Sequence, residues 1–397
     1  MSDDRPTEAG REKYESLRKS ADRTHLCNAP VTNLYFRTDG LVEPCWLQIG
    51  DGSNRWTPEN SIMDIWNGRF LSDLRSDLAD GKLKGMCWQC KECIDQGTRP
   101  LALSYEDVEP NPGYEYPAML EMELSNHCNL ECVMCQGTLS HLIRRNREHL
   151  PPLPMAYDES FVEQTREVIP HLKELRFNGG EPFTQSIVFD ICEQVYELNP
   201  DLKITIATNG TVLNERVKSH LDRGNFHLNI SIDSLRKERY EAIRIRADHD
   251  VLMSNFQYFK EYTESRERIL SVMVNPMRSN WDEMGEIMAW ATGEGVHCWY
   301  NVVRYPLHSA IWNLPSDEIA NIIEVLSAHE FVHDPEMTRD YIFANNMVAW
   351  NHLIGDQLPA WLSEQREREE AGDTVHMDAT TPLSLGPTRR GSDESHR

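Results

Sequence analysis

The chain has 397 residues, enough for two or three domains, and a formal net charge of −24. This acidity disfavours binding to nucleic acids, because such binding depends on Lys and Arg side chains that neutralise phosphates. No stretch approaches the roughly 20 apolar residues that a membrane-spanning helix needs, and the sequence begins without the basic and apolar parts of a secretory signal. We therefore expect a cytoplasmic protein whose ten cysteines are reduced or bound to metal.

The N-terminal third of the chain shows no regular alternation of strands and helices. Residues 1–24 are charged, with helix-like spacing, and predict a leader helix. Residues 25–100 hold five cysteines among strand-like runs at 33–37 and 41–44 and a helical pattern at 62–78. We expect a small domain that has little core of its own and is ordered by metal. Prolines and a glycine in residues 101–117 predict a linker.

Strand and helix patterns alternate regularly from residue 118 to residue 310. Strands are expected at 119–124, 172–177, 203–208, 227–232, 270–275 and 297–303. Helices are expected at 158–168, 185–198, 213–222, 251–265 and 281–292. Such an α/β pattern of six successive units predicts parallel strands in an open, partial (β/α)6 barrel.

The remaining residues divide into two parts. Residues 311–364 contain helical patterns that we expect to pack on or beside the barrel. Residues 365–397 have almost no large apolar side chains, so burial cannot offset the entropy lost on ordering them. We expect a disordered tail there.

Three cysteines, Cys128, Cys132 and Cys135, follow the first barrel strand within eight residues. Four thiolates normally complete a four-iron cluster or a closed zinc site, so three leave one position open for another ligand. A structural zinc site is the alternative, but it usually takes paired two-residue spacings, and no fourth ligand is close by in the sequence. We expect the chemistry at the open position.

The spacing of these cysteines resembles the signature of the radical SAM superfamily. The resemblance implies that the three thiols hold a [4Fe-4S] cluster, whose fourth iron binds the amino and carboxylate groups of S-adenosylmethionine (SAM). The family often has an aromatic residue before the last cysteine. Met134 stands there instead and offers a similar apolar, polarisable contact. The implied reaction is reductive cleavage of SAM to a 5′-deoxyadenosyl radical, which removes a hydrogen atom from an unactivated carbon.

Polar motifs follow the later strands, where barrels of this kind place their active sites. Gly179, Gly180 and Glu181 follow the second strand; paired glycines let a ligand approach the backbone closely. By resemblance, Glu181 binds the amino group of SAM. The resemblance also implies that SAM contacts residues on the next three strands, namely Thr208, Asn209, Ser231, Asp233, Val274 and Asn275. Ser231 and Asp233 match positions at its ribose or carboxylate, and the strand of Val274 packs near its adenine.

Five further cysteines, Cys27, Cys45, Cys87, Cys90 and Cys93, precede the barrel. They resemble the twitch or SPASM element that holds auxiliary iron–sulfur clusters, although in most relatives this element follows the barrel. Four thiols suffice for one auxiliary [4Fe-4S] cluster, and we favour the first four, while Cys93 could replace one of them. A zinc ribbon would also order such a domain, but ribbon ligands usually come as two close pairs.

The sixth strand carries the candidate catalytic residues. Cys298 could donate a hydrogen atom to a substrate radical, although a buried strand cysteine is the simpler interpretation. Tyr300 shares the strand, and Arg304 is a candidate for binding an anionic group of the substrate.

These observations favour an enzyme that abstracts hydrogen from a small biosynthetic metabolite, with net oxidation through the auxiliary cluster. A flavodoxin or ferredoxin-type protein would supply electrons. A peptide maturase is the alternative, although such enzymes often add a leader-binding module that we do not expect before Cys27. A non-catalytic iron–sulfur or zinc-binding regulator is the alternative of another class, and the ligand-like motifs at four strand ends argue against it.

Overall fold

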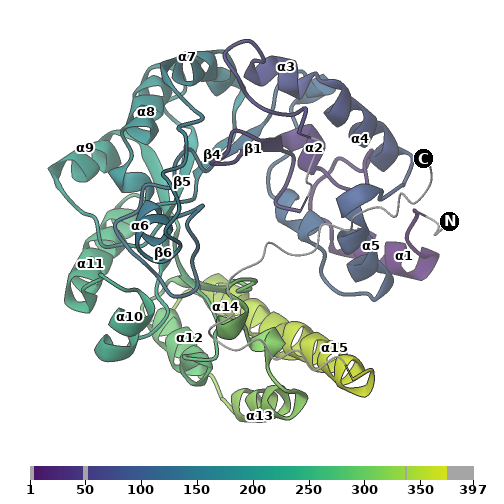
Figure 1. Ribbon diagram of the computed structural model, residues 1–397, viewed down its shortest axis with the longest axis vertical. Coiled ribbons are helices and arrows are strands. Elements are labelled where there is room, and N and C mark those ends of the chain that lie inside the picture. Colours follow the sequence, from purple (N-terminus) through teal and green to yellow (C-terminus); the bar gives the residue numbers. More distant parts are fainter. Residues whose placement is uncertain (1–3, 48–51, 336–337, 373–397) are drawn as a thin grey trace.

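The computed structural model describes residues 4–47, 52–335 and 338–372. Its described part contains an eight-stranded sheet in the order β2-β1-β3-β4-β5-β6-β7-β8. The strands are β1 (Asn33–Phe36), β2 (Val42–Glu43), β3 (Met119–Met122), β4 (Glu174–Phe177), β5 (Lys203–Thr208), β6 (Asn225–Ser231), β7 (Leu270–Val274) and β8 (His297–Tyr300). Neighbouring strands run parallel except β1 and β2. The sheet curves into an arc with its strands inside and helices outside (Figure 1).

The six strands expected from the sequence are present as β3 to β8. A seventh strand, β1, also runs parallel with them, and the sequence prediction did not include it in this sheet. β1, which the sequence analysis assigned to a separate small domain, pairs parallel with β3. Leu34 and Phe36 of β1 are fully buried in the same core as Leu120 and Met122 of β3. This shared burial joins the N-terminal region to the main sheet.

Helices between the strands cover the outer face of the arc (Figure 1). They are α7 (Glu159–Val168), α8 (Ser186–Leu198), α9 (Glu215–Arg223), α10 (Lys237–Ile243), α11 (His249–Ser265) and α12 (Met284–Gly293). α7 begins at Asp158, whose carboxylate accepts hydrogen bonds from the backbone N–H groups of Ser160 and Phe161. α11 begins at Asp248 in the same way. Apolar side chains of these helices and of the strands form one continuous core.

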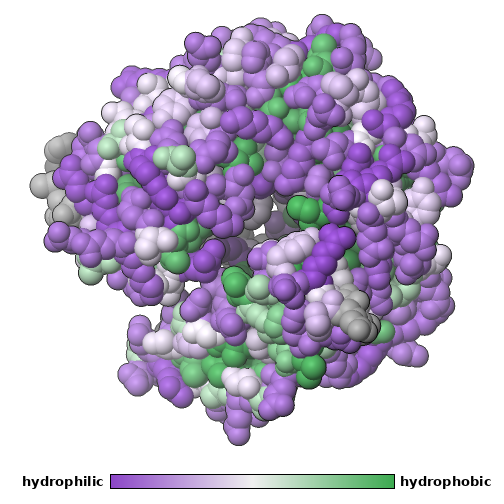
Figure 2. Space-filling model, turned by 180° about the vertical axis from the view of Figure 1, so that it is seen from behind, coloured by the Kyte–Doolittle hydropathy of each residue, from purple (hydrophilic) through white to green (hydrophobic). Residues whose placement is uncertain are grey.

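The strand side chains that face the inside of the arc are largely polar. Glu121, Arg176, Thr205 and His227 occupy one row across β3 to β6, because side chains alternate between the two faces of a strand. Arg176 forms ion pairs with Glu174 at 2.9 Å and with Glu121 at 3.4 Å. Viewed from behind, the surface is mostly hydrophilic and is hollowed at its centre, where the arc encloses space (Figure 2).

Within residues 4–47 and 52–100, the N-terminal region contains five short helices: α1 (Glu8–Leu17), α2 (Ala29–Thr32), α3 (Ile62–Trp66), α4 (Arg69–Ala79) and α5 (Trp88–Asp95). Tyr14 of α1 packs with Leu78 and Ile94 in a small core that does not involve the sheet. The segment predicted to be a linker, 101–117, connects α5 to β3. It forms two 3-10 turns, Leu101–Tyr105 and Pro112–Tyr114, and the Tyr105 side chain is buried.

The C-terminal region contains α13 (Ser316–Ser327), α14 (Asp340–Asn351) and α15 (Leu358–Glu370), and a π-helical segment, His352–Gln357, joins the last two. α14 packs on β8, and α13 packs on α15. Disorder was predicted to begin at residue 365. For residues 365–370 this prediction is wrong, because α15 continues to Glu370 and Gln365 is buried. The predicted tail from residue 373 lies outside the described residues. No helix in the described ranges is long and apolar enough to cross a membrane.

Candidate active site

Cys128, Cys132 and Cys135 lie in the loop after β3, at the carboxyl end of the parallel strands. They pack together around Leu130 and Met134. Burial, with the neighbouring thiols, raises the pKa of Cys128 and Cys135 to about 12, so a metal must displace their protons to bind. Within the described ranges, no three His, Cys, Asp or Glu side chains converge tightly enough to hold a single metal ion. Three thiols grouped in one loop are the donor set expected for an iron–sulfur cluster with one open coordination position, whereas a structural zinc site takes four protein ligands.

The loop of the three thiols is held by backbone hydrogen bonds from two other segments. The N–H groups of Glu131 and Val133 donate to the carbonyl oxygens of Ile245 and Ile243, at 3.0 and 2.9 Å. On another side, the carbonyl oxygen of His127 accepts a 2.8 Å hydrogen bond from the N–H of Glu181. These contacts fix the loop against the segment after α10 and against the end of β4.

Gly179 and Gly180, after β4, both have positive φ angles, of +66° and +55°. A Cβ atom on Gly180 would lie 2.4 Å from the carbonyl oxygen of His127, so only glycine allows this close approach to the cysteine loop. The two glycines thereby place Glu181 next to that loop.

The carboxylate of Glu181 is fully buried. It accepts hydrogen bonds from Thr208 Oγ1 and the Asn209 N–H at 2.8 Å each, and from the Phe183 N–H at 3.1 Å. Burial raises the pKa of Glu181 to about 7, although these hydrogen bonds favour the ionised form. The structure thus joins the ends of β4 and β5 at one carboxyl group that titrates near neutral pH.

Of the other residues expected to contact SAM, some face the inside of the arc and others do not. Ser231, at the end of β6, is half-buried on the inner face of the arc. Asn209 Nδ2 donates to Asn129 Oδ1 in the cysteine loop at 2.9 Å. Val274 is fully buried in the core with the outer helices, so the structure does not place it in the cavity. Asn275, the next residue, contacts Asp233 instead.

Asp233 is completely buried, and protein groups already bind both of its carboxylate oxygens. Oδ1 accepts from the N–H and Nδ2 of Asn275, at 2.7 and 3.1 Å. Oδ2 lies 2.7 Å from Arg244 Nη2 and 2.8 Å from Arg244 Nε. Each oxygen of Asp233 thus has two partners, so no lone pair is left for the expected direct contact with SAM, whereas Glu181 Oε2 accepts one hydrogen bond and keeps room for a second. Sequence reasoning missed Arg244, whose pairing with Asp233 depends on how the chain folds back after α10.

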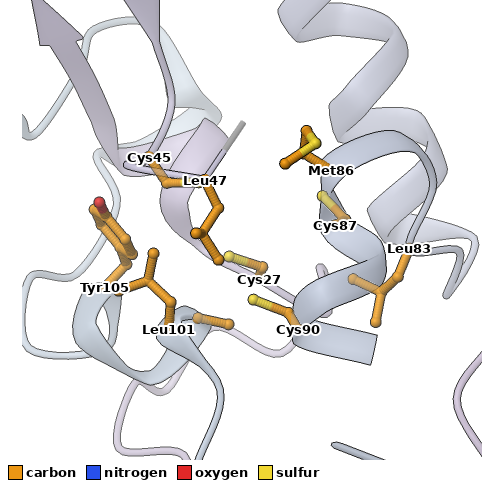
Figure 3. Close-up of a pocket in the computed structure, with 10 residues that line it drawn as sticks. Cys27, Cys45, Leu47, Leu83, Met86, Cys87, Cys90, Leu101 and Tyr105 are labelled. Atoms are coloured by element: carbon orange, nitrogen blue, oxygen red, sulfur yellow. The ribbon is translucent and has the colours of Figure 1, made fainter. Parts of the chain in front are cut away.

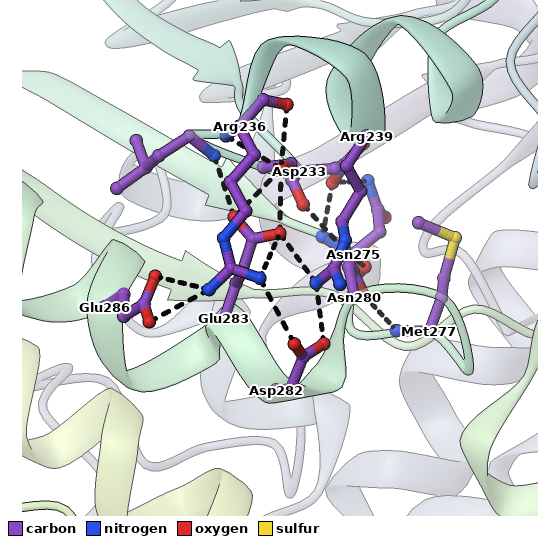
Figure 4. A network of polar contacts seen from close by, with 11 residues as sticks. Asp233, Arg236, Arg239, Asn275, Met277, Asn280, Asp282, Glu283 and Glu286 are labelled. Atoms are coloured by element: carbon purple, nitrogen blue, oxygen red, sulfur yellow. Dashed lines mark hydrogen bonds and ion pairs between the residues drawn. The ribbon is translucent and has the colours of Figure 1, made fainter.

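A polar network surrounds Asp233 at the ends of β6 and β7 (Figure 4). Asn280 Nδ2 donates to the backbone carbonyl oxygens of Asp233 and Asn275, at 2.8 and 3.1 Å. The buried carboxylate of Glu283 accepts from Ser234 Oγ at 2.9 Å and pairs with Arg239 at 2.7 Å. The network ties α12 to these strand ends and fixes the position of Asp233.

Four of the five N-terminal cysteines, Cys27, Cys45, Cys87 and Cys90, line one pocket (Figure 3). The pocket encloses about 330 Å³, part of it open to solvent, and its other walls are Leu47, Leu83, Met86, Leu101, Ala102 and Tyr105. Burial, and then the negative charge of the other three thiolates, raises the pKa of Cys27. Because the lining is otherwise almost entirely apolar, these cysteines stay protonated unless a cationic group binds and stabilises their thiolates.

Cys93 does not line this pocket. It lies one turn further along α5; burial raises its pKa, and the charge of Arg304 opposes that shift. Arg304 is itself exposed in the segment after β8. The structure thus brings Cys93 near Arg304, and Cys93 also lies close enough to Cys90 for its charge to raise the pKa of that pocket thiol.

Cys298 and Tyr300 lie on the face of the sheet that packs against the outer helices. They share a face of the sheet with Val272 and Val274, which belong to the core with the outer helices. Cys298 is fully buried, and Tyr300 Oη donates to the carbonyl oxygen of Met284 in α12 at 2.9 Å. The burial of Cys298 agrees with the simpler interpretation of a buried strand cysteine, and because both side chains point toward the helices, the structure gives no support to a catalytic role for either.

Comparisons with known proteins agree with this geometry. Residues 122–291 match the family model of the radical SAM superfamily. GTP 3′,8-cyclase from Streptomyces coelicolor is 25% identical over 174 residues, which are 43% of this chain and 49% of the relative. The mitochondrial GTP 3′,8-cyclase of Arabidopsis thaliana is 23% identical over 197 residues, 49% of this chain and 48% of the relative. The chain thus spans about half the length of these curated relatives.

Among solved structures, the crystal structure of Streptococcus suis SuiB is 13% identical, with a TM-score of 0.40 over 66% of this chain and 58% of that one. The sequence match covers β4 to β7 and the loop of Cys128, Cys132 and Cys135. Residues 122–291 of this chain therefore form a domain of the radical SAM superfamily, a superfamily of enzymes.

Proposed function

We propose that the protein binds a [4Fe-4S] cluster through Cys128, Cys132 and Cys135, binds SAM beside it, and catalyses a reaction that begins with hydrogen-atom abstraction. When bound, the reduced cluster supplies one electron that cleaves a carbon–sulfur bond of SAM. The observation that carries the proposal is the direct connection between the loop of Cys128, Cys132 and Cys135 and the segment that carries the buried carboxylate of Glu181. The His127 carbonyl oxygen accepts a hydrogen bond from the N–H of Glu181, which directly follows Gly180, the glycine that approaches this loop most closely.

The protein's own residues would bind and orient SAM. Glu181, in its ionised form, is the partner for the ammonium group, and Thr208 and the Asn209 N–H hold it in position. Ser231 and Asn209 supply polar contacts on the inner face of the arc. The burial of Cys128 and Cys132 keeps water from the reacting atoms. Asp233 acts indirectly, because it holds Arg244.

We further propose that Cys27, Cys45, Cys87 and Cys90 hold an auxiliary [4Fe-4S] cluster of the twitch or SPASM kind. The pocket that these four thiols line supports this assignment over one that includes Cys93. An auxiliary cluster closed by four protein thiols suits electron transfer, so the proposed reaction is a net oxidation. A flavodoxin or ferredoxin-type protein is the proposed electron donor.

A small polar metabolite is the proposed substrate. The relatives are named GTP 3′,8-cyclases, and that name describes a small phosphorylated substrate for those proteins. The polar inner face of the arc, with Arg176 and Lys203 near paired carboxylates, also suits a polar ligand. A peptide substrate is the alternative, and we would expect it to compete poorly with metabolites in a substrate screen.

The test is anaerobic reconstitution with iron and sulfide, followed by incubation with SAM and dithionite. We expect 5′-deoxyadenosine from the wild type and none from a Cys132→Ala variant. Cys192→Ala is the matched control, because Cys192 is a buried packing residue of α8. A fully loaded wild-type protein that forms no 5′-deoxyadenosine would instead support the non-catalytic iron–sulfur regulator.

A further inference from the structure

Arg244 is a buried cation in contact with a cluster ligand. Its side chain is 7% exposed, and its Nη1 lies 3.8 Å from the Sγ of Cys132, within hydrogen-bonding range for sulfur. The remaining guanidinium nitrogens, Nε and Nη2, both bind Asp233. One guanidinium therefore joins the end of β6 to one of the three thiols.

The backbone holds Arg244 directly opposite Cys132. The residues on either side of Arg244, Ile243 and Ile245, accept the N–H groups of the residues on either side of Cys132. These are Val133 and Glu131, at 2.9 and 3.0 Å. Such paired bonds fix the register of the two segments, so the contact between the guanidinium and the sulfur does not depend on a flexible side chain alone.

Other cations near the loop are placed differently. Arg147 Nη2 donates to the backbone carbonyl oxygen of Cys132 at 2.7 Å. Arg246 is half-exposed and pairs with Glu131 at 3.3 Å. An exposed, paired cation is screened by water and salt, whereas a buried cation acts through a lower dielectric. Arg244 is therefore the cation whose charge acts most directly on the cluster.

We propose that Arg244 is a positioning residue that raises the reduction potential of the cluster bound by Cys132, and that Asp233 limits this effect. The proposal rests on the function proposed above, which places a cluster there. Reduction adds a negative charge to a cluster, and the potential depends on net charge and on hydrogen bonds to the sulfurs. A buried guanidinium beside a ligand sulfur stabilises the reduced state, and the carboxylate of Asp233 partly cancels its charge.

The experiment is a redox titration of the reconstituted full chain without SAM, with the reduced cluster measured by its electron paramagnetic resonance signal. Auxiliary cysteines Cys27 and Cys90 are replaced by Ala in every sample, so that one cluster is observed. In Arg244→Gln, we expect the ratio of reduced to oxidised cluster at a fixed potential to fall at least tenfold, which equals 59 mV for one electron. In Asp233→Asn, we expect the opposite shift, because the guanidinium loses its counter-charge.

Arg246→Gln is the matched control, since it removes a cation two residues away that does not contact the sulfur; its ratio should change less than twofold. A fully loaded Arg244→Gln protein whose ratio changes less than twofold would overturn the proposal. If Arg244→Gln does not bind a cluster, the result for Asp233→Asn tests the proposal. A cluster reduction potential above that of the parent protein supports it, and an equal or lower potential overturns it. A parent protein that takes up no iron at Cys128, Cys132 and Cys135 would overturn the proposed function instead.

Discussion

Thr208 Oγ1 donates a 2.8 Å hydrogen bond to Glu181 Oε1, and this bond joins the ends of β5 and β4. The Asn209 N–H binds the other carboxylate oxygen at the same distance. Full burial nevertheless raises the pKa of Glu181 to about 7, so the group is only half ionised at neutral pH in the absence of a cation. Because an ammonium group binds only the ionised carboxylate, this relationship makes SAM binding depend on pH.

We expect the affinity for SAM to rise about tenfold between pH 6 and pH 8. A carboxyl group with a pKa of about 7 is roughly one-tenth ionised at the lower pH and nine-tenths ionised at the higher one. The measurement is isothermal titration calorimetry on the loaded protein, in which binding at pH 7 should also release about half a proton per SAM bound, because about half of the Glu181 carboxyl groups are protonated beforehand. Glu181→Gln should bind weakly with a flat pH profile, and an equally flat wild-type profile would contradict the assigned role of Glu181.

Gly180→Ala should destabilise the fold by about 1–3 kcal/mol, through a positive φ angle and a steric clash. The added Cβ would lie 2.4 Å from the His127 carbonyl oxygen, so the cysteine loop must move. Urea unfolding of the iron-free protein measures the effect. Gly293→Ala is the matched control, because its Cβ meets nothing within 4 Å at the end of α12. Equal unfolding free energies for Gly180→Ala and the wild type would contradict this prediction.

Much of the fold and of the site could be predicted from local patterns. The six strands β3 to β8 follow from their apolar runs, and the thiol loop and the Gly180–Glu181 segment follow from motifs at strand ends. Parallel strands bring such ends together at one edge of the sheet, so motifs far apart in sequence become neighbours. The grouping of the thiol loop with Glu181 and Thr208 is therefore accessible without a structure.

The errors arise where a residue's position depends on non-local pairing. Leu34 and Phe36 alternate as in any strand, and nothing local indicates that β1 joins β3 instead of a separate domain. Alternation likewise gives Cys298 one of two faces, and only its register with Val272 shows that it faces the helices. Arg244 escaped notice because its partners, Asp233 and Cys132, lie 11 and 112 residues away in the sequence.

Tyr105 connects the two parts of the molecule, because its ring lines the four-thiol pocket and its Oη donates to Glu121 Oε2 in the arc at 3.2 Å. Tyr105→Phe should cost about 1–2 kcal/mol of unfolding free energy, since the buried Glu121 keeps its bonds to Asn33 and Arg176 but loses one donor. Iron content should not change, because the ring remains. Loss of iron in Tyr105→Phe would show instead that the hydroxyl group supports the cluster.

The assignment of the auxiliary ligands predicts different results for two cysteines on the same helix. Cys90 lines the four-thiol pocket and Cys93 does not, although both belong to α5. We expect Cys93→Ala to retain the iron and sulfide content of the wild type, and Cys90→Ala to lose about four iron and four sulfide per chain, as expected for one [4Fe-4S] cluster. Both measurements are made on a background with Cys128, Cys132 and Cys135 replaced by Ala, so that only the auxiliary site contributes. Equal losses of iron and sulfide in Cys90→Ala and Cys93→Ala would place Cys93 among the ligands. Zinc without iron or sulfide in the background protein that carries only the three replacements would make the site a structural zinc site.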